Sequence, residues 1–282
     1  MKQLKCCKIN FLQWRMNPKY FLALLFLGFN MWNCFHGFLA YAQALGYPMR
    51  PWLLAMLPGM REYFIIVMLA FVLLVSDAPF RSRQQQFVLQ RIGKRNWIQG
   101  QLLYLFLVSV IFTVILWFLT WAFFLSELEW KNGWGPAIQK AAQTGAHAIY
   151  SPVAFSYEII KNATPLEANA WCFFMMIAVC VLLGEVITLC NLWGKSGLGT
   201  AIVTGLIMLS YLLRQFSSTV GAYRFILWVS PVSWIDRSMM GHTNQNLPSF
   251  AYSACMAAGL CLVLGGVIVG IVHRCNLETD KE

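Results

Sequence analysis

Long apolar runs alternate with shorter polar connections along this chain, and the lengths of the runs predict helices that cross a membrane. A membrane-spanning helix needs about 20 predominantly apolar residues. Four runs reach that length, at 20–42, 101–124, 168–192 and 250–272, and two shorter runs lie at 61–76 and 198–213. We expect the shorter runs to cross as well, because a bilayer can thin around a short span. The pattern predicts an all-α, polytopic membrane protein with six transmembrane helices in a single transmembrane domain.

Composition excludes a soluble globular domain. The chain is 59% hydrophobic and only 11% charged, whereas about 25% of the residues in a typical soluble domain are charged. A net charge of +10 is also typical of proteins that bind nucleic acid, but here the basic residues flank apolar runs, where anionic lipid headgroups would meet them. We therefore expect membrane lipids as partners and no nucleic acid.

The distribution of Lys and Arg predicts the orientation. Thirteen of the 21 basic residues lie in the N-terminal segment, the 77–100 connection, the 191–197 turn and the tail after Val272. Because cytosolic connections carry the excess of Lys and Arg, both termini are predicted to be cytosolic, with 1–19 as an inner interfacial segment and 125–167 and 214–249 as outer loops. A cleaved signal peptide ending near Ala42 is the alternative for the first run, which is long for that role.

The connection at 78–95 has the clearest internal organisation. It holds five cations, and they are Arg81, Arg83, Arg91, Lys94 and Arg95. Gly93 can end a surface helix, and Asn96 with Gln99 predicts an N-cap for the next span. Such a helix would dock into a groove of another protein and pass movement into the third span. The alternative is an ordinary cytosolic loop whose charge only sets orientation.

Three further features lie within the apolar runs. Glu185 is the one acidic residue well inside a clear span, which makes it a functional candidate. The alternative is that it reaches headgroup water or pairs with Lys195. Gly266 and Gly270 form a GxxxG step that we expect to pack within the chain. The nine cysteines include no CxxC pair and are expected to be small buried hydrophobes, although Cys6 and Cys7 could carry lipid.

Two short segments carry a family resemblance. The run 88–103, punctuated by Arg91, Gly93, Trp97 and Gly100, resembles the segment after the second span of ABC-2 type transporter permeases. The run 230–235 is similar to the Pro-containing outer element of that family, which makes Pro231 and Trp234 candidates for an outer gate. The resemblance implies an ATP-driven transporter in which two membrane domains pair and each engages a separate ATPase. Residues 78–95 would then be the coupling helix, and Ile9 to Met16 the interfacial helix.

The chain has no GxxxxGK[ST] sequence, so ATP and Mg would be bound by the partner ATPase, and we expect no cofactor, metal or enzymatic activity in this chain itself. The resemblance predicts a permease that works as an exporter in a bacterial plasma membrane, paired with an identical or paralogous copy. The many aromatic residues of the outer loops indicate an amphipathic or hydrophobic cargo, such as a peptide, lipid or drug. A secondary transporter or a polytopic membrane enzyme is the alternative. Against these, the sequence shows no internal repeat, no HExxH pair and no GxSxG motif.

Overall fold

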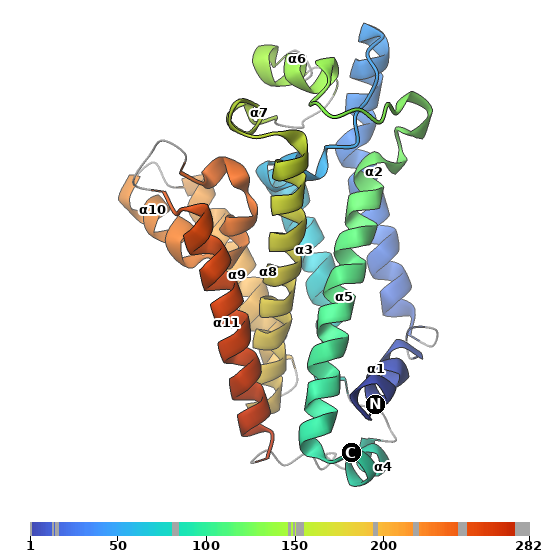
Figure 1. Cartoon of the computed structure of the whole chain (residues 1–282), viewed down its shortest axis with the longest axis vertical. Coiled ribbons are helices and arrows are strands. Elements are labelled where there is room, and N and C mark those ends of the chain that lie inside the picture. The colour runs from blue at the N-terminus through green and yellow to red at the C-terminus, as the bar shows by residue number, and fades with distance from the viewer. Residues whose placement is uncertain are drawn as a thin grey trace.

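The computed structural model describes residues 2–12, 14, 17–80, 85–145, 148, 150, 155–193, 197–216, 220–241 and 247–273. Within these ranges all regular structure is helical, apart from one isolated bridge between Met49 and Leu128. The elements are α1 (Lys2–Leu12), α2 (Pro18–Leu45), η2 (Leu54–Gly59), α3 (Arg61–Val75), α4 (Gln85–Ile92), α5 (Lys94–Ala122), η3 (Leu125–Glu127), α6 (Pro136–Thr144), α7 (Tyr157–Asn162), α8 (Pro165–Trp193), α9 (Leu198–Phe216), α10 (Val220–Val229), η5 (Pro231–Ile235), η6 (Arg237–Met239) and α11 (Phe250–Ile271) (Figure 1).

Four of the described helices, α2, α5, α8 and α11, are long and apolar enough to cross a membrane, which indicates a membrane-embedded protein. This confirms the all-α class and the four clear apolar runs. The two shorter predicted runs also form helices. Helix α3 has 15 residues, or about 22 Å at 1.5 Å per residue, and the apolar part of α9 is Leu198–Leu212.

Local sequence explains why α2 extends beyond the predicted run at both ends. Asn17 caps the helix by accepting a hydrogen bond from the Lys19 amide at 3.1 Å, and Pro18 occupies the first turn, where a missing N–H costs nothing. Gly46 closes the other end in the left-handed conformation, with φ of 65°. The apolar pattern alone predicts the apolar part of a helix but not the capped turns at its two ends.

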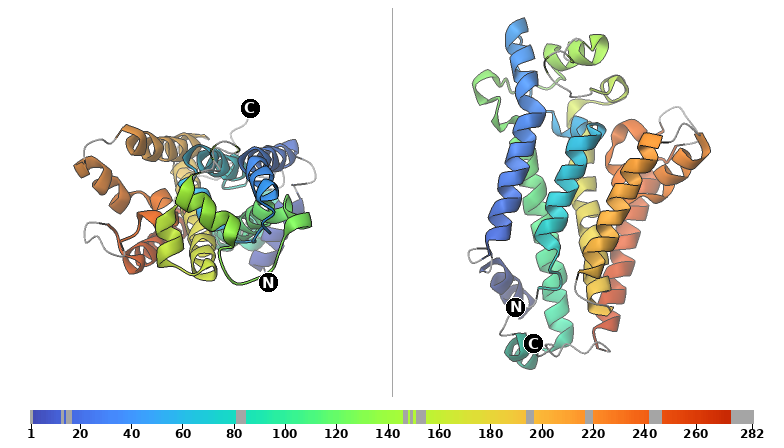
Figure 2. Two further views of the ribbon diagram at one scale, coloured as in Figure 1. Left: turned by 90° about the horizontal axis from the view of Figure 1, so that it is seen from above. Right: turned by 180° about the vertical axis from the view of Figure 1, so that it is seen from behind.

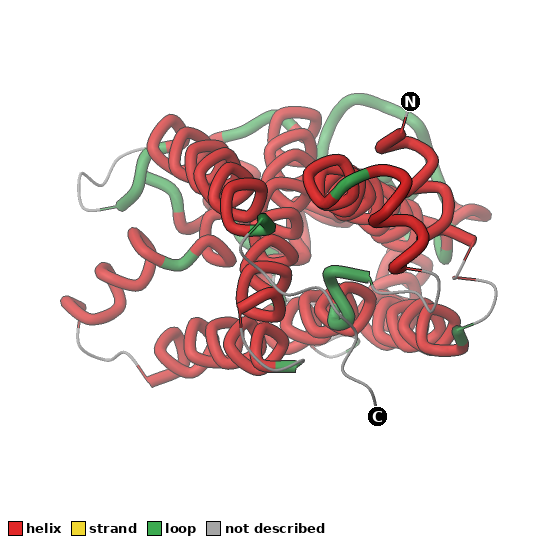
Figure 3. Tube along the Cα trace, turned by 90° about the horizontal axis from the view of Figure 1, so that it is seen from below, coloured by secondary structure: helices red, strands yellow, loops and turns green. Residues whose placement is uncertain are grey.

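Helix α8 lies at the centre of the bundle and α11 at its edge. Of the most apolar stretch of each helix, 61% is buried in α8 but only 11% in α11. The bundle seen along its axis has α9, α10 and α11 on one side and α1 and α2 on the other (Figures 2 and 3). Exposed apolar side chains such as Phe21 of α2 and Leu262 of α11 cover the outside, as expected for helices that face lipid.

Aromatic side chains gather at two levels of the bundle. At the end that carries α1 and α4, which we call the inner end, Trp14 stacks on Tyr20 with ring centroids 4.9 Å apart, and Tyr104 of α5 lies beside them. Towards the other end, Trp121 packs edge-on against Trp130 at 5.4 Å. Tyr104 and Trp121 are 17 residues apart on α5, or about 25 Å. This spacing is close to the roughly 30 Å hydrocarbon core that aromatic belts border.

A helical cap covers the outer end, where α6 and α7 lie above the bundle (Figure 1). The segment after α2 pairs with the segment after α5, because the Met49 amide donates to the Glu127 carbonyl and the Glu129 amide to the Met49 carbonyl, both at 2.9 Å. The Trp134 indole donates to the Ala163 carbonyl at 3.0 Å. Helix α6 in this loop is closed by Gly145, which caps it in the left-handed conformation with φ of 63°.

Three local predictions were wrong. The first helix begins at Lys2 rather than at Ile9, because its buried side chains, among them Cys6 and Asn10, pack on α5. The predicted end at Met16 lies outside the described residues. Helix α5 starts at Lys94 directly after Gly93, so Asn96 is not the N-cap of this helix. The side-chain amide of Asn96 instead donates to the Ile92 carbonyl.

The third concerns the GxxxG step of α11. Neither Gly266 nor Gly270 has any heavy atom within 4 Å of the position where a Cβ would stand. The GxxxG step therefore does not pack within the described chain, and both glycines lie on the exposed side of α11. It is the neighbouring Gly265 that faces the interior of the bundle.

Candidate functional site

The segment Ser76–Phe80, between α3 and α4 at the inner end, is bound by side chains from several helices. Asn191 near the end of α8 donates to the carbonyls of Ala78 at 2.7 Å and Ser76 at 3.4 Å. Thr200, in the first turn of α9, donates to the same Ser76 carbonyl at 3.2 Å. Asn191 also accepts from the Gly199 amide at 3.1 Å, which ties α8 to the start of α9.

Gln101 of α5 holds the other end of this segment. Its amide nitrogen donates to the Phe80 carbonyl at 3.1 Å, and its amide oxygen accepts from the Phe80 amide at 3.3 Å. The same oxygen accepts from the Asn10 side chain of α1 at 2.9 Å. Gln101 is 3% exposed, so these bonds replace those that water would make, and a lost partner would leave a buried polar group unsatisfied.

Helix α2 completes the arrangement. The Lys19 ammonium donates to the Ser76 hydroxyl at 3.2 Å and forms an ion pair with Asp77. We call the segment Ser76–Phe80 together with Lys19, Gln101, Asn191 and Thr200 the inner junction. Helices α2, α5, α8 and α9 therefore all bind one short segment that precedes α4 in the chain.

Helix α1 lies against the inner part of α5. Gly100 allows this contact, because a Cβ there would stand 2.8 Å from the Cβ of Cys6. Trp14 donates to the Tyr104 hydroxyl a little further along α5. Burial raises the pKa of Cys6 to about 11, so its thiol stays protonated and unreactive near neutral pH. Cys6 and Cys7 are both buried, which places them as packing residues rather than as exposed acceptors of lipid.

The predicted coupling residues fall in and around α4. Arg81 and Arg83 lie outside the described residues. Arg91 is in the last turn of α4, and Lys94 and Arg95 begin α5. Arg91 and Arg95 are exposed. Gly93 separates the two helices with φ of 82° and ψ of 151°, in the region of backbone conformation that favours glycine. A helix, a break and a new helix were predicted here and are present, with α4 as Gln85–Ile92 rather than the whole of 78–95.

Glu185 lies inside the bundle between α5 and α11. Its side chain is 5% exposed, and a Cβ on Gly265 would stand 3.1 Å from its Oε1 atom. Its Oε2 atom is buried with no hydrogen-bond partner, and in the part of the chain that is described no basic side chain pairs with it. Lys195, its expected partner, lies outside the described residues. The burial of Glu185 disfavours contact with headgroup water, and its pairing with Lys195 stays a prediction.

The outer-gate candidates Pro231 and Trp234 both belong to η5. Pro231 starts this turn, and Trp234 is 1% exposed. The Trp234 indole donates to the Leu227 carbonyl of α10 at 3.0 Å, and the Trp234 carbonyl accepts from the Trp171 indole of α8 at 3.3 Å. Tyr252 of α11 packs edge-on against the Trp234 ring. Trp234 therefore joins three helices at the outer end.

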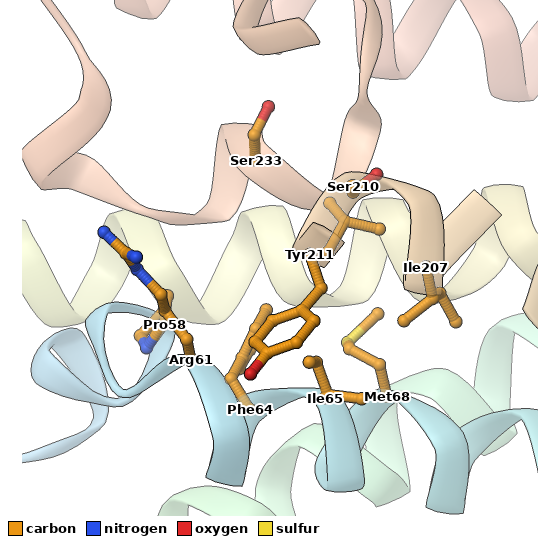
Figure 4. Close-up of a pocket in the computed structure, with 10 residues that line it drawn as sticks. Pro58, Arg61, Phe64, Ile65, Met68, Ile207, Ser210, Tyr211 and Ser233 are labelled. Carbon is orange, nitrogen blue, oxygen red and sulfur yellow. The ribbon is translucent and has the colours of Figure 1, made fainter. Parts of the chain in front are cut away.

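A small cavity lies beside η5, between α3 and α9 (Figure 4). Tyr211 reaches from α9 towards Phe64 and Ile65 of α3, and Arg61 lies at the outer edge. The cavity holds about 20 Å³, which is room for a single water molecule. It is too small to hold a cargo molecule in this conformation.

No group of three or more His, Cys, Asp and Glu residues within the described ranges could hold a metal ion. The sequence indicated the basic connection and η5, but it did not single out Lys19, Gln101, Asn191 or Thr200. The signal that marks them is weak: each is a polar residue near the inner end of an apolar helix, where polar residues are common. Only the fold shows that all four meet one segment.

Comparison with protein-family models, with curated proteins and with solved structures finds no match to this chain.

Proposed function

We propose that this chain is the membrane-spanning permease subunit of an ATP-driven transporter of the ABC-2 type. In this proposal six helices, α2, α3, α5, α8, α9 and α11, cross a bacterial plasma membrane, and both termini lie in the cytosol. Two membrane subunits pair, identical or paralogous, and each engages a separate ATPase that binds ATP and Mg. The cargo is an amphipathic or hydrophobic molecule that is exported.

The inner junction is the observation that carries the proposal. A partner that pushes on α4 would move Ser76–Phe80, and the bonds from Gln101 and Asn191 would draw α5 and α8 along. Gly93 provides a break at which α4 can turn relative to α5. A ligand can shift such an equilibrium only by binding one arrangement better than the other, and nucleotide binding in the partner would supply that difference.

The positive charge around α4 and the start of α5 also supports this surface as the docking site for the ATPase. Exposed Arg91 and Arg95 project from the α4–α5 region at the inner end, and the resemblance places the ATPase contact here. A polar or acidic groove on the ATPase would complement these arginines, chiefly by speeding encounter and fixing register.

The test compares two double charge reversals at the same end of the molecule. Arg91→Glu with Arg95→Glu should weaken co-purification of the ATPase in mild detergent and lower ATP hydrolysis by the complex. Lys5→Glu with Lys8→Glu changes two exposed cations of α1 and should leave the complex intact. Equal loss in both variants, or no loss in the first, would contradict α4 as the docking site. A tagged chain that purifies from its native membrane without any ATPase would overturn the proposal as a whole.

One observation favours a second candidate function, a secondary transporter. Glu185 is buried in a membrane helix with one carboxylate oxygen unpartnered, and intramembrane carboxylates are typical of proton relays. Proton-driven transport that persists without an ATPase and is lost in Glu185→Gln would support this alternative. ATP-dependent transport that survives in Glu185→Gln would exclude it.

A further inference from the structure

A second and larger cavity lies next to η5. It has a volume of about 210 Å³ and is bounded by α8, α9, α10 and η5. Leu182, Leu183 and Val186 form its floor on α8, and apolar side chains of the other three elements form its walls. An apolar cavity of roughly 150 Å³ is already large enough to bind benzene, so this one can take a longer stretch of hydrocarbon.

The polar groups in the described lining of the cavity are already satisfied. This part of the lining contains two hydroxyl groups, those of Ser210 and Ser230, which lie 2.7 Å apart and hydrogen-bond to each other. The Ser210 hydroxyl also lies 2.8 Å from the Leu206 carbonyl and can donate to it. A buried water normally makes about three hydrogen bonds, and these walls offer it few. Chemistry therefore favours an apolar occupant over water.

The position of the cavity identifies the source of such an occupant. Leu206 lies six residues beyond Thr200 on α9, and Val186 lies five residues before Asn191 on α8. At 1.5 Å per residue, both helices place the near edge of the cavity about 8 Å from the inner junction, and Ser210 about 15 Å from it. These depths are well within a hydrocarbon core roughly 30 Å thick.

The cavity opens sideways between α9 and α10. At its mouth the side chains of Leu209, Phe225 and Val229 are 52%, 69% and 56% exposed. At this depth the surroundings of an exposed apolar side chain are lipid tails. No charged residue is found among the described residues that line the cavity, so this lining favours an acyl chain over a headgroup.

We propose that this cavity binds the distal part of the acyl chain of a membrane lipid. The chain enters between α9 and α10 and packs against α8, while its headgroup stays at the membrane surface. Transfer of the chain from the bilayer gains little hydrophobic free energy, because lipid is already apolar. Van der Waals packing against the lining supplies the preference. This inference rests on membrane embedding alone and holds whether or not an ATPase drives the protein.

The test uses the purified full-length chain in lipid nanodiscs that contain a trace of phosphatidylcholine with a diazirine near the end of one acyl chain. After irradiation, mass spectrometry maps the crosslinked residues. We expect crosslinks concentrated at 182–186, 206–210 and 225–232. Leu209→Trp fills the mouth and should lower crosslinking at 182–186 several-fold. Leu262→Trp makes the same change on the exposed face of α11, where the side chain is 79% exposed, and should leave it unchanged.

Three outcomes would overturn the proposal. Crosslinks spread evenly over the exposed faces of α2, α9 and α11 would show annular lipid without a site. An equal effect of Leu209→Trp and Leu262→Trp on the cavity residues would show that the mouth is not the entry. A second lipid with the diazirine near the carbonyl end of the chain should label the cavity several-fold less, and equal labelling by both probes would contradict the proposed depth.

Discussion

The inner junction and the outer element around Trp234 both fasten helices through main-chain carbonyls, but with different side chains. At the inner junction, Gln101 and Asn191 each donate and accept, so each amide binds a backbone N–H as well as a carbonyl. In the outer element, Trp171 and Trp234 only donate, and ring packing supplies the rest of the contact.

This difference has mechanical consequences. Hydrogen bonds are directional and weaken steeply with misalignment, so the amides hold Ser76–Phe80 in one register and can release it in a discrete step. Ring packing is much less directional, since it depends on area removed from solvent rather than on a bond angle, and it tolerates small shifts of α8 relative to α10. The inner end is therefore suited to transmit a movement, and the outer end to accommodate one.

The change that should break the inner junction most completely is Asn191→Leu. It removes the bonds to the Ala78 and Ser76 carbonyls and the acceptor for the Gly199 amide, and an unsatisfied buried group costs about 1–3 kcal/mol. Thr200 still donates to Ser76, so we expect a loss of about 3 kcal/mol in the free energy of unfolding. Unfolding in mixed micelles of dodecyl sulfate and dodecylmaltoside measures it.

Asn33→Leu is the matched control. Asn33 is also an amide within an apolar helix, half-buried on α2, and its side chain makes no hydrogen bond to any described residue, so its replacement should change stability by less than about 0.5 kcal/mol. If Asn33→Leu and Asn191→Leu cost the same, the junction has no special role in holding the fold.

Trp234→Phe probes the outer element and should cost less. A six-membered aromatic ring remains to pack against Tyr252, while the rest of the indole and its bond to the Leu227 carbonyl are lost. The Ser233 hydroxyl also lies within reach of that carbonyl, at 3.4 Å, so the carbonyl keeps a partner. We expect a loss of about 1 kcal/mol, measured by the same unfolding assay.

Trp193→Phe makes the same substitution at the end of α8, where the side chain is 79% exposed, and should be close to neutral. A loss at Trp234 as large as that at Asn191 would remove the contrast between the two ends of the bundle.

Sequence alone predicted the helices better than the site. Apolar runs identified α2, α5, α8 and α11 because each run is as long as a bilayer is thick, and Gly93 marked the break before α5 because it can adopt positive φ. The inner junction could not be predicted, since Lys19, Gln101 and Asn191 are far apart in the chain and meet only through helix packing. The exposed GxxxG of α11 was misassigned for the same reason, because spacing shows that a helix has a small face but not which way it points.

The smallest expected effect concerns the outer cap, beyond both regions. Lys131, through a hydrogen bond, and Arg50, at 2.9 Å, lower the pKa of Glu129 below its usual value, although burial opposes the shift. A lowered pKa means that the stabilising contacts are complete above about pH 4.3, the usual value for Glu, and are lost as pH falls through the lower pKa of the folded state. Hydrogen exchange of 46–52 and 127–133, corrected for the intrinsic effect of pH, should therefore rise below about pH 4.

Glu129→Gln should show the faster exchange at every pH. Glu127→Gln changes an exposed carboxylate that has no ion pair in the described chain, and it should behave as the unmodified protein. An acid-dependent rise that persists in Glu129→Gln would assign the pH response to another group.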